Sequence, residues 1–272
     1  MIAGKGVYPR LLAESARMQG VSRIFVLAFR GETDRAIEQW ADQIEWVHLG
    51  QFGVMLETLR GSGLHHAVMA GQITPTNLFR LRLDAKTLDI LRRLRVRNAE
   101  TIFGAVADEL KAVGLELLPA SSFMQAHMPS AGILSNRPPS DSEQRDIEIG
   151  FKVAKVTSGV DIGQTVVVKE GTILAVEAFE GTDETIARAG KLGGPGVVVV
   201  KVAKQGHDMR FDIPVIGRHT MTVLRSVRAA ALALEEGRAI LLEREAIIGD
   251  ANRMGLCLSV MAGLQAPRPS GG

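Results

Sequence analysis

The sequence predicts an α/β protein with two domains, and three observations support this fold class. In the first half, short β-rich apolar runs alternate with helical patterns, which is typical of a parallel sheet covered by helices. From Gly163 onward the pattern changes to valine-rich strands and a hairpin. The length of 272 residues suits two hydrophobic cores better than one. We therefore expect a parallel-sheet domain and a second α/β domain, joined by a short linker.

The first half supplies short strands and helices in alternation. Strands are expected at residues 2–3, 23–29, 45–49, 66–70 and 116–118. Helices are expected at residues 9–17, 35–40 and 53–62, and across most of 75–114. Ligands of open parallel sheets bind beyond the carboxyl ends of the strands. Gly4, Gly6, Gly71 and Gln72 would lie at that edge, so they are candidate substrate-binding residues.

Two interpretations stay open for these residues. Gly4-Lys5-Gly6 resembles half of a dinucleotide-binding loop, but Pro9 takes the place of the third glycine. The turn either connects a strand to a helix or contacts a phosphate, for which the backbone donors of the following helix are suited. Gln72 either belongs to a chain turn or forms a hydrogen bond with a base or a sugar.

Turn-forming residues between Pro129 and Asp141 indicate the linker. The domains are expected at residues 1–130 and 143–266, with the linker at 131–142 and a disordered tail at 267–272. Helices of the second domain are expected at residues 142–158, 182–189, 221–234 and 245–254. Thr182 is the expected N-cap of the second of these. Strands are expected at 166–168 and 173–176, which form a hairpin, and at 197–202, 239–242 and 256–260.

The composition excludes several classes of protein. The net charge is +2, so no global field directs the chain to nucleic acid or acidic lipid. The single cysteine, Cys257, excludes an internal disulfide framework, and its apolar surroundings predict a buried, unreactive thiol. No stretch reaches the roughly 18–20 apolar residues of a membrane span, and no signal peptide is recognisable. We expect a cytoplasmic protein without a nucleic-acid partner.

Carboxylates of the second domain give the strongest indication of chemistry. Glu177 and Glu180 end an apolar run, and Asp183 follows them. Acids beside buried residues are costly unless they are paired, and either a divalent cation or a polyphosphate with its metal would pair them. Asp212 lies before an isoleucine-proline pair, whose restricted backbone offers a rigid mount for a catalytic group. These four acids are the candidate metal ligands, and the alternative is that they cap helices and lie in solvated turns.

Two further groups have both a functional and a plain explanation. His207 and His219 flank the acidic segments and are either acid–base groups or surface histidines. Residues 80–97 carry many arginines among leucines, and form either a solvated helix face or a surface for phosphates, RNA or an anionic membrane. Aromatic residues make up 4% of the chain, which argues against stacking on single-stranded nucleic acid.

Several short stretches, in order along the chain, match a known pattern. They are Ile2-Ala3-Gly4-x-Gly6, Ala70-Gly71-Gln72, Asp161-Ile162-Gly163-Gln164, Ala175-Val176-Glu177-Ala178-x-Glu180-Gly181-Thr182-Asp183 and Asp212-x-Pro214-x-Ile216-Gly217. With these the chain resembles the UDP-2,3-diacylglucosamine pyrophosphatases of lipid A biosynthesis, in the family that is not calcineurin-like. The fourth stretch is specific, whereas the glycine loop of the first is not.

This resemblance implies a Rossmann-like N-terminal domain and a C-terminal α/β domain of unusual fold, with the lipid held between them. It implies Mg²⁺-dependent hydrolysis to UMP and 2,3-diacylglucosamine 1-phosphate, with water attacking the phosphorus next to the sugar. Asp212 corresponds to the critical aspartate of the family, as a metal ligand or as a general base. Gln164 and Thr182 lie in the matching stretches, and we expect them to bind the substrate.

The residues also leave two other functions open. A non-catalytic protein that binds a nucleotide sugar or a lipid would use the same acids to hold a structural metal. An RNA-binding or membrane-surface module would instead use residues 80–97. A homodimer and a peripheral contact with the inner membrane are both compatible with the sequence.

Overall fold

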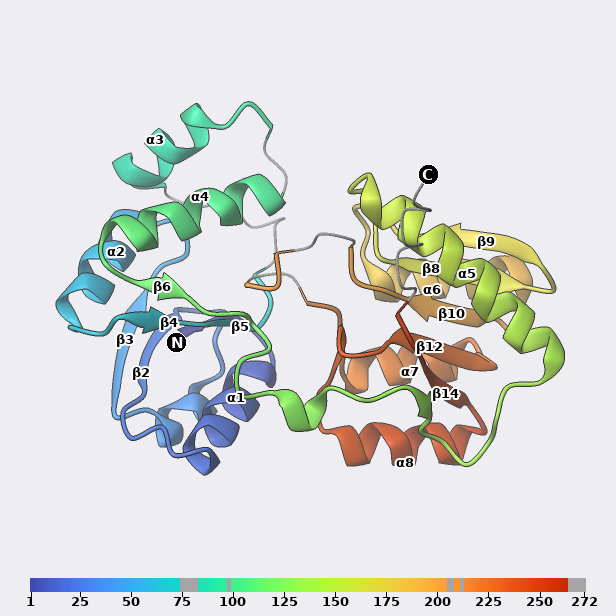
Figure 1. Ribbon diagram of the computed structural model, residues 1–272. Coiled ribbons are helices and arrows are strands. Elements are labelled where there is room, and N and C mark those ends of the chain that lie inside the picture. The colour runs from blue at the N-terminus through green and yellow to red at the C-terminus, as the bar shows by residue number, and fades with distance from the viewer. Residues whose placement is uncertain (74–82, 97–98, 205–207, 211–212, 264–272) are drawn as a thin grey trace, which may run out of the picture. The chain divides into compact units, whose positions relative to one another are not determined.

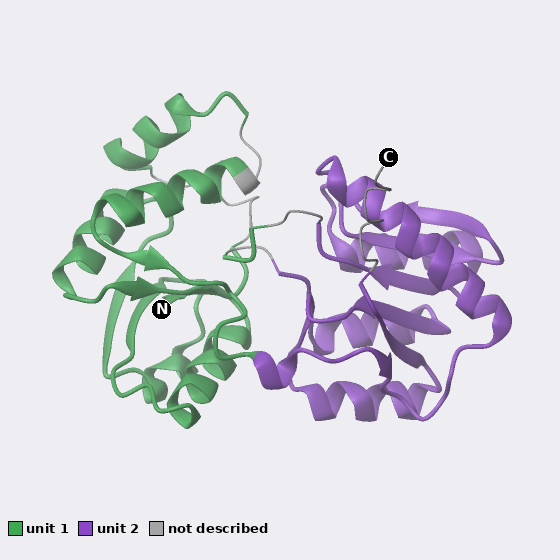
Figure 2. Ribbon diagram, in the orientation of Figure 1, with its two compact units in different colours: residues 1–124, 208–212 green, residues 125–207, 213–272 purple. Residues whose placement is uncertain are grey.

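The computed structural model describes residues 1–73, 83–96, 99–204, 208–210 and 213–263. The chain divides into two compact units (Figure 2). The first comprises Met1–Met124 and Asp208–Asp212, and the second comprises Gln125–His207 and Ile213–Gly272. The chain therefore passes from one unit to the other three times.

The first unit is built on a parallel sheet with the strand order β3-β2-β1-β5 (Figure 1). Its strands are β1 (Ile2–Ala3), β2 (Phe25–Phe29), β3 (Gln43–Val47) and β5 (Met69–Ala70). Only Val68 separates β5 from β4 (His66–Ala67), which pairs in parallel with β6 (Glu116–Leu117). Val68 O accepts a hydrogen bond of 2.8 Å from Ile2 N, so β4 and β5 act as one strand. The predicted parallel sheet is confirmed.

Helices cover this sheet and bury its apolar side chains. They are α1 (Tyr8–Met18), the 3₁₀ helix η1 (Arg35–Trp40), α2 (Phe52–Gly61), α3 (Ala85–Arg93) and α4 (Ala99–Ala112). Ile2 and Leu27 of the sheet share a buried cluster with Leu56 of α2 and Leu110 of α4. The helical pattern at residues 75–114 is represented by α3 and α4, and residues 74–82 lie outside the described part.

The second unit contains a six-stranded mixed sheet with the order β7-β14-β12-β10-β8-β9 (Figure 1). The strands are β7 (Gly132–Ile133), β8 (Thr165–Lys169), β9 (Thr172–Val176), β10 (Val198–Lys201), β12 (Ala231–Glu235) and β14 (Cys257–Met261). The three central strands β10, β12 and β14 are parallel. β7, β8 and β9 pair antiparallel with their neighbours, and β8 and β9 form the predicted hairpin.

Both faces of this sheet are covered by helices. Side chains alternate along β10, so Val200 packs with Phe151 of α5 (Asp141–Gly159) on one face. Val199 packs on the other face with Ile186 of α6 (Thr182–Gly193) and Leu224 of α7 (Arg218–Ser226). α8 (Arg244–Met254) joins α6 and α7 on that face. A small parallel sheet of β11 (Val215–Ile216) and β13 (Ile240–Leu241) completes the unit.

Two predictions of local structure were wrong. The expected helix at 221–234 ends at Ser226, and β12 occupies Ala231–Glu235. Every residue of β12 is buried, and a strand buried on both faces lacks the alternation that distinguishes it from a helix. Thr182 is also not the N-cap of α6. Gly181 takes that position with a φ of 85°, and no side chain caps the helix.

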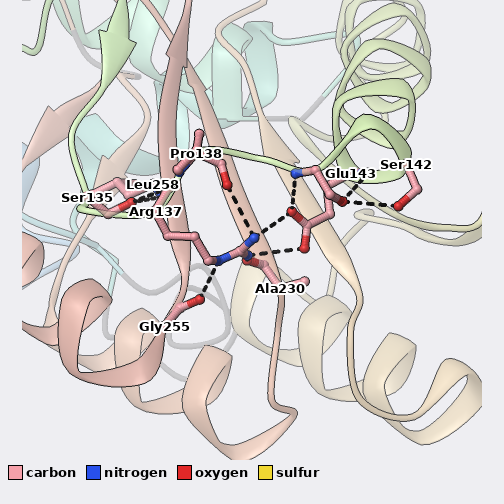
Figure 3. Close-up of polar contacts among 9 residues, drawn as sticks. Ser135, Arg137, Pro138, Ser142, Glu143, Ala230, Gly255 and Leu258 are labelled. Carbon is pink, nitrogen blue, oxygen red and sulfur yellow. Dashed lines mark hydrogen bonds and ion pairs between the residues drawn. The ribbon is translucent and has the colours of Figure 1, made fainter.

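The turn-rich segment before α5 is attached to the second unit through Arg137 (Figure 3). The Arg137 guanidinium donates two hydrogen bonds, of 2.8 and 3.1 Å, to the Glu143 carboxylate. It also donates to Gly255 O at 2.7 Å and to Ala230 O at 2.5 Å. Glu143 in turn forms the capping box of α5 with Ser140. This one side chain therefore connects the segment to α5, β12 and α8.

Two expectations from the composition concern the single cysteine and membrane-spanning helices. Cys257 is buried and free, and burial raises the pKa of its thiol, as expected for an unreactive cysteine. None of the helices in the described part of the chain combines the length and the hydropathy needed to cross a bilayer.

Candidate functional site

At the carboxyl ends of β1 and β5, two chain segments pair very closely. Lys5 N donates to Gln72 O at 2.8 Å, and Gln72 N donates to Lys5 O at 3.0 Å. A Cβ atom on Gly4 would lie 2.7 Å from Gln72 O, and one on Gly71 would lie 2.8 Å from Lys5 O. Neither position can carry a side chain without a shift of backbone. The structure therefore brings Gly4, Gly71 and Gln72 together.

A cavity of about 340 Å³ lies at the same edge of the sheet. Gly6 lines it, and a φ of 94° at this residue turns the chain into α1. Lys5 and Arg10 contribute positive charge to the lining, and Glu32 and Asp34 contribute negative charge. This lining suits a nucleotide, because cations or N–H groups can bind the phosphate and carboxylates can bind the ribose.

In the second unit, the hydroxyl group of Thr182 joins several polar side chains at the carboxyl end of β10. Lys201 Nζ donates to Thr182 Oγ1 at 2.5 Å, and Thr182 Oγ1 donates to Glu177 Oε1 at 2.9 Å. Thr165 Oγ1 lies 3.3 Å from the same hydroxyl oxygen. Gln164 N donates to Glu177 Oε2 at 3.3 Å. Three predicted site residues, Gln164, Glu177 and Thr182, are thus neighbours.

Glu180 is held by other partners. Its Oε1 accepts a hydrogen bond of 2.5 Å from Arg188, and its Oε2 accepts one of 3.2 Å from Ala178 N. Its own backbone N–H and the Arg188 guanidinium hold the pKa of Glu180 below its ordinary value. This carboxylate is therefore ionised and engaged with Arg188.

Asp183 connects the start of α6 to the start of α7. Asp183 Oδ1 accepts a hydrogen bond of 2.9 Å from Thr220 Oγ1, and Asp183 Oδ2 lies 3.5 Å from His219 Nε2. The helix α7 begins at Arg218, directly after the stretch that contains Asp212. Asp212 and His207 lie outside the described residues.

Comparison with known proteins identifies the family of the chain. The LpxI N-terminal domain family matches residues 1–127, and the LpxI C-terminal domain family matches residues 130–259. The chain belongs to the LpxI family. A relative from Caulobacter vibrioides, named UDP-2,3-diacylglucosamine pyrophosphatase LpxI, is 32% identical over 94% of each chain. The family resemblance indicated by the sequence is confirmed.

The acidic residues of the second unit are the candidate ligands for a metal ion. Within the described residues, no group of three or more His, Cys, Asp or Glu could hold a metal. Glu177, Glu180 and Asp183 bind different partners, as given above. Mg²⁺ usually keeps several waters and takes one or two protein carboxylates. The described acids therefore form no all-protein cage for a metal.

Three charged residues at the carboxyl edge of the second sheet were not indicated by the sequence pattern. One is Lys201, which ends the valine run of β10. The others are Lys155 and Glu235, whose Nζ and Oε atoms lie 2.6 Å apart, and both of which hydrogen-bond Ala203. For Lys201 the available signal was a charged residue at the end of an apolar run. The same signal at Glu235 was lost because a helix was expected at 221–234, and Lys155, inside α5, has no such signal.

Proposed function

We propose that this protein hydrolyses the pyrophosphate of UDP-2,3-diacylglucosamine, releasing UMP and 2,3-diacylglucosamine 1-phosphate for lipid A biosynthesis. The observation that carries the proposal is the 32% identity, along 94% of the chain, with a relative named UDP-2,3-diacylglucosamine pyrophosphatase. Matches to both LpxI domain families support it further.

In this proposal, the first unit contributes substrate-binding residues at the edge of its parallel sheet. Gly4, Gly6, Gly71 and Gln72 would supply backbone and amide groups to the substrate. The cavity of about 340 Å³ lined by Lys5 and Gly6 supports this. The edge beyond the carboxyl ends of parallel strands is where nucleotides bind in open α/β sheets.

The pyrophosphate end is proposed to bind at the carboxyl edge of the second sheet, with Gln164 and Thr182 as substrate-binding residues. Asp212, with Glu177, Glu180 and Asp183, is the proposed carboxylate set for Mg²⁺. The hydrogen bonds between Gln164, Glu177 and Thr182 support a common site for these residues. When bound, Mg²⁺ would neutralise charge on phosphoryl oxygens.

The proposed reaction is an attack of water on the phosphorus next to the sugar. The water oxygen forms a new bond to that phosphorus, and the bond from this phosphorus to the bridging oxygen breaks. UMP leaves with the bridging oxygen, and the attacking water loses one proton. Asp212 is proposed either to take this proton or to bind the metal. Hydrolysis in H₂¹⁸O should therefore place the label on the sugar phosphate, and label found on UMP would contradict the proposed site of attack.

The assignment of Asp212 can be tested by substitution. Asp212→Ala should lower UMP release by about 10²–10⁴-fold, measured by chromatography with purified full-length protein and substrate. The circular dichroism spectrum and the melting temperature should stay close to those of the wild type. Asp141→Ala, which removes an exposed aspartate at the start of α5, is the matched control and should leave turnover unchanged. Near-normal turnover of Asp212→Ala would overturn the assignment.

The same assay separates hydrolysis from simple binding. Wild-type protein that binds the substrate in the presence of Mg²⁺ but releases no UMP would support a non-catalytic nucleotide-sugar or lipid-binding protein instead. Isothermal titration calorimetry gives the binding, and UMP release gives the chemistry.

A further inference from the structure

Lys201 occupies a distinctive position at the carboxyl edge of the second sheet. It is the last residue of β10 and pairs with Thr165 of β8 on one side and with Leu234 of β12 on the other. The three preceding residues of β10 are completely buried valines, whereas Lys201 is partly exposed. Strand alternation puts its side chain on the same face as Val199, which is the face covered by α6. Its stem can therefore lie on the apolar face while its ammonium group reaches the edge.

The partners of the Lys201 ammonium group leave most of its donors unused. Its hydrogen bond to Thr182 Oγ1 occupies one of three N–H groups. Within the described part of the chain, no carboxylate lies within ion-pair distance of Lys201. By contrast, Lys155 is paired with Glu235 at 2.6 Å, and Lys169 donates to two backbone carbonyls.

A partly buried ammonium group with unused donors is suited to an anion, and lysine is a common ligand of phosphate groups as a point charge. The hydroxyl of Thr182 fixes the direction of this ammonium group, because the same hydroxyl donates to Glu177. Glu177 is anchored in turn by the backbone N–H of Gln164. The cation is therefore held by a chain of hydrogen bonds that leaves its outer donors free to bind a ligand.

We propose that Lys201 binds a phosphoryl oxygen of the substrate pyrophosphate, and that Thr182 and Glu177 position its ammonium group. The role of the pyrophosphate as ligand rests on the proposed function. The assignment adds a cation to a site for which the sequence indicated acids alone.

Substitution of Lys201 gives a direct test with full-length protein. Lys201→Met keeps the apolar stem and removes the charge, so KM for the substrate should rise by about 10- to 100-fold. Lys201→Arg should restore at least part of this loss, because it restores the charge. Inorganic pyrophosphate should inhibit the wild type by competition, and its inhibition constant should rise in Lys201→Met by a similar factor. The melting temperature should change little.

Lys169→Met is the matched control. Lys169 lies on β8 of the same sheet and donates to Gly193 O and Pro195 O, away from Thr182. Its substitution should leave KM and the inhibition constant for pyrophosphate unchanged.

The outcomes separate this inference from the proposed function. If the wild type releases UMP and Lys201→Met keeps its KM and its inhibition by pyrophosphate, the inference is wrong and the proposed function stands. If Lys201→Met loses activity together with folding stability and Lys201→Arg restores only stability, the role is structural and the inference is also wrong. If the wild type releases no UMP, the proposed function fails. In that case, calorimetry compares the affinity of the wild type and of Lys201→Met for inorganic pyrophosphate. Equal affinities would contradict the inference about Lys201.

Discussion

The hydroxyl group of Thr182 is the contact shared by a cation and a carboxylate. A hydroxyl has one donor and two acceptor positions, and Thr182 uses the donor for Glu177 and one acceptor for Lys201. A short hydroxyl side chain such as that of threonine can therefore connect the lysine and the glutamate, which carry opposite charges. A serine could form the same bonds, but it would lack the methyl group that restricts the side-chain rotamer.

Removal of this hydroxyl should affect both stability and activity. Thr182→Val keeps the shape of the side chain and leaves Glu177 and Lys201 without their common partner. We expect a loss of about 1–3 kcal/mol in the free energy of unfolding, measured by urea denaturation, together with reduced UMP release. Thr172→Val, at an exposed position of β9, should stay within about 0.5 kcal/mol of the wild type. Equal free energies of unfolding of the two variants would show that the hydrogen bonds of the Thr182 hydroxyl do not stabilise the fold.

A second prediction at this scale concerns Gly71. Its φ of 93° and the 2.8 Å separation of a built Cβ from Lys5 O both disfavour a side chain. Gly71→Ala should lower the free energy of unfolding by about 2 kcal/mol or more. Gly61→Ala, at the end of α2 where a Cβ meets nothing, should be neutral or stabilising by about 0.5 kcal/mol. Thermal unfolding of both variants checks this contrast.

At the scale of elements, the contact between Arg137 and Glu143 fixes the segment before α5. Burial alone would raise the pKa of Glu143, but hydrogen bonds from Arg137 and from Ser140 N–H outweigh it and hold this pKa below its ordinary value. A depressed carboxyl pKa means stability that is present above the unfolded-state pKa and is lost as pH falls through the folded-state pKa. Glu143 therefore stabilises the protein near neutral pH and not in strong acid.

Arg137→Met should accordingly destabilise the protein in a pH-dependent way. The expected loss is about 2 kcal/mol at pH 7, and the difference from the wild type should shrink as pH falls below the ordinary pKa of glutamate, about 4.3. Urea denaturation at pH 7 and pH 3 measures both differences. Arg145→Met, at an exposed position on the same helix, is the control. A loss that is equal at both pH values would contradict the ion-pair explanation.

Most elements were predictable from the sequence because their apolar residues recur with a helical period or are β-branched, as strands favour. The helices at 9–17 and 245–254 lie within α1 and α8, and the valine runs form β8 and β10. The strand β12 was not predictable in this way, because its alanines and leucines are buried on both faces. Because a helix was expected there, the position of Glu235 at the end of a strand was not predicted.

The candidate site was predictable only in part, for a related reason. Glu177 and Thr182 stand in a specific sequence stretch and Gln164 ends another matching stretch, so the sequence could point to them. Which group pairs with which is decided by tertiary contacts, such as Lys201 with Thr182 and Arg188 with Glu180. The local sequence around a lysine at the end of a strand does not show whether its side chain binds a ligand or lies in solvent.

At the scale of the whole molecule, removal of the metal should separate activity from folding. The described residues contain no cage of three ligands for a metal, and the buried clusters of both units are apolar. EDTA should therefore abolish UMP release while the melting temperature changes by no more than about 2–4 °C, a shift worth about 1 kcal/mol in proteins of this size. Added Mg²⁺ should restore the activity. Full turnover in EDTA would contradict the proposed metal dependence, and unfolding in EDTA would indicate a structural metal.

The return of the chain to its first unit affects how the protein can fold during its own translation. Asp208–Arg210 belongs with the first unit, and Met209 O accepts a hydrogen bond of 2.7 Å from Ala120 N. Domains of many proteins fold one after another as they leave the ribosome. Here the amino-terminal unit acquires its last piece only after β8, β9 and β10 have been translated. Nascent chains stalled before residue 208 should therefore be more sensitive to protease in this unit than chains released after synthesis is complete.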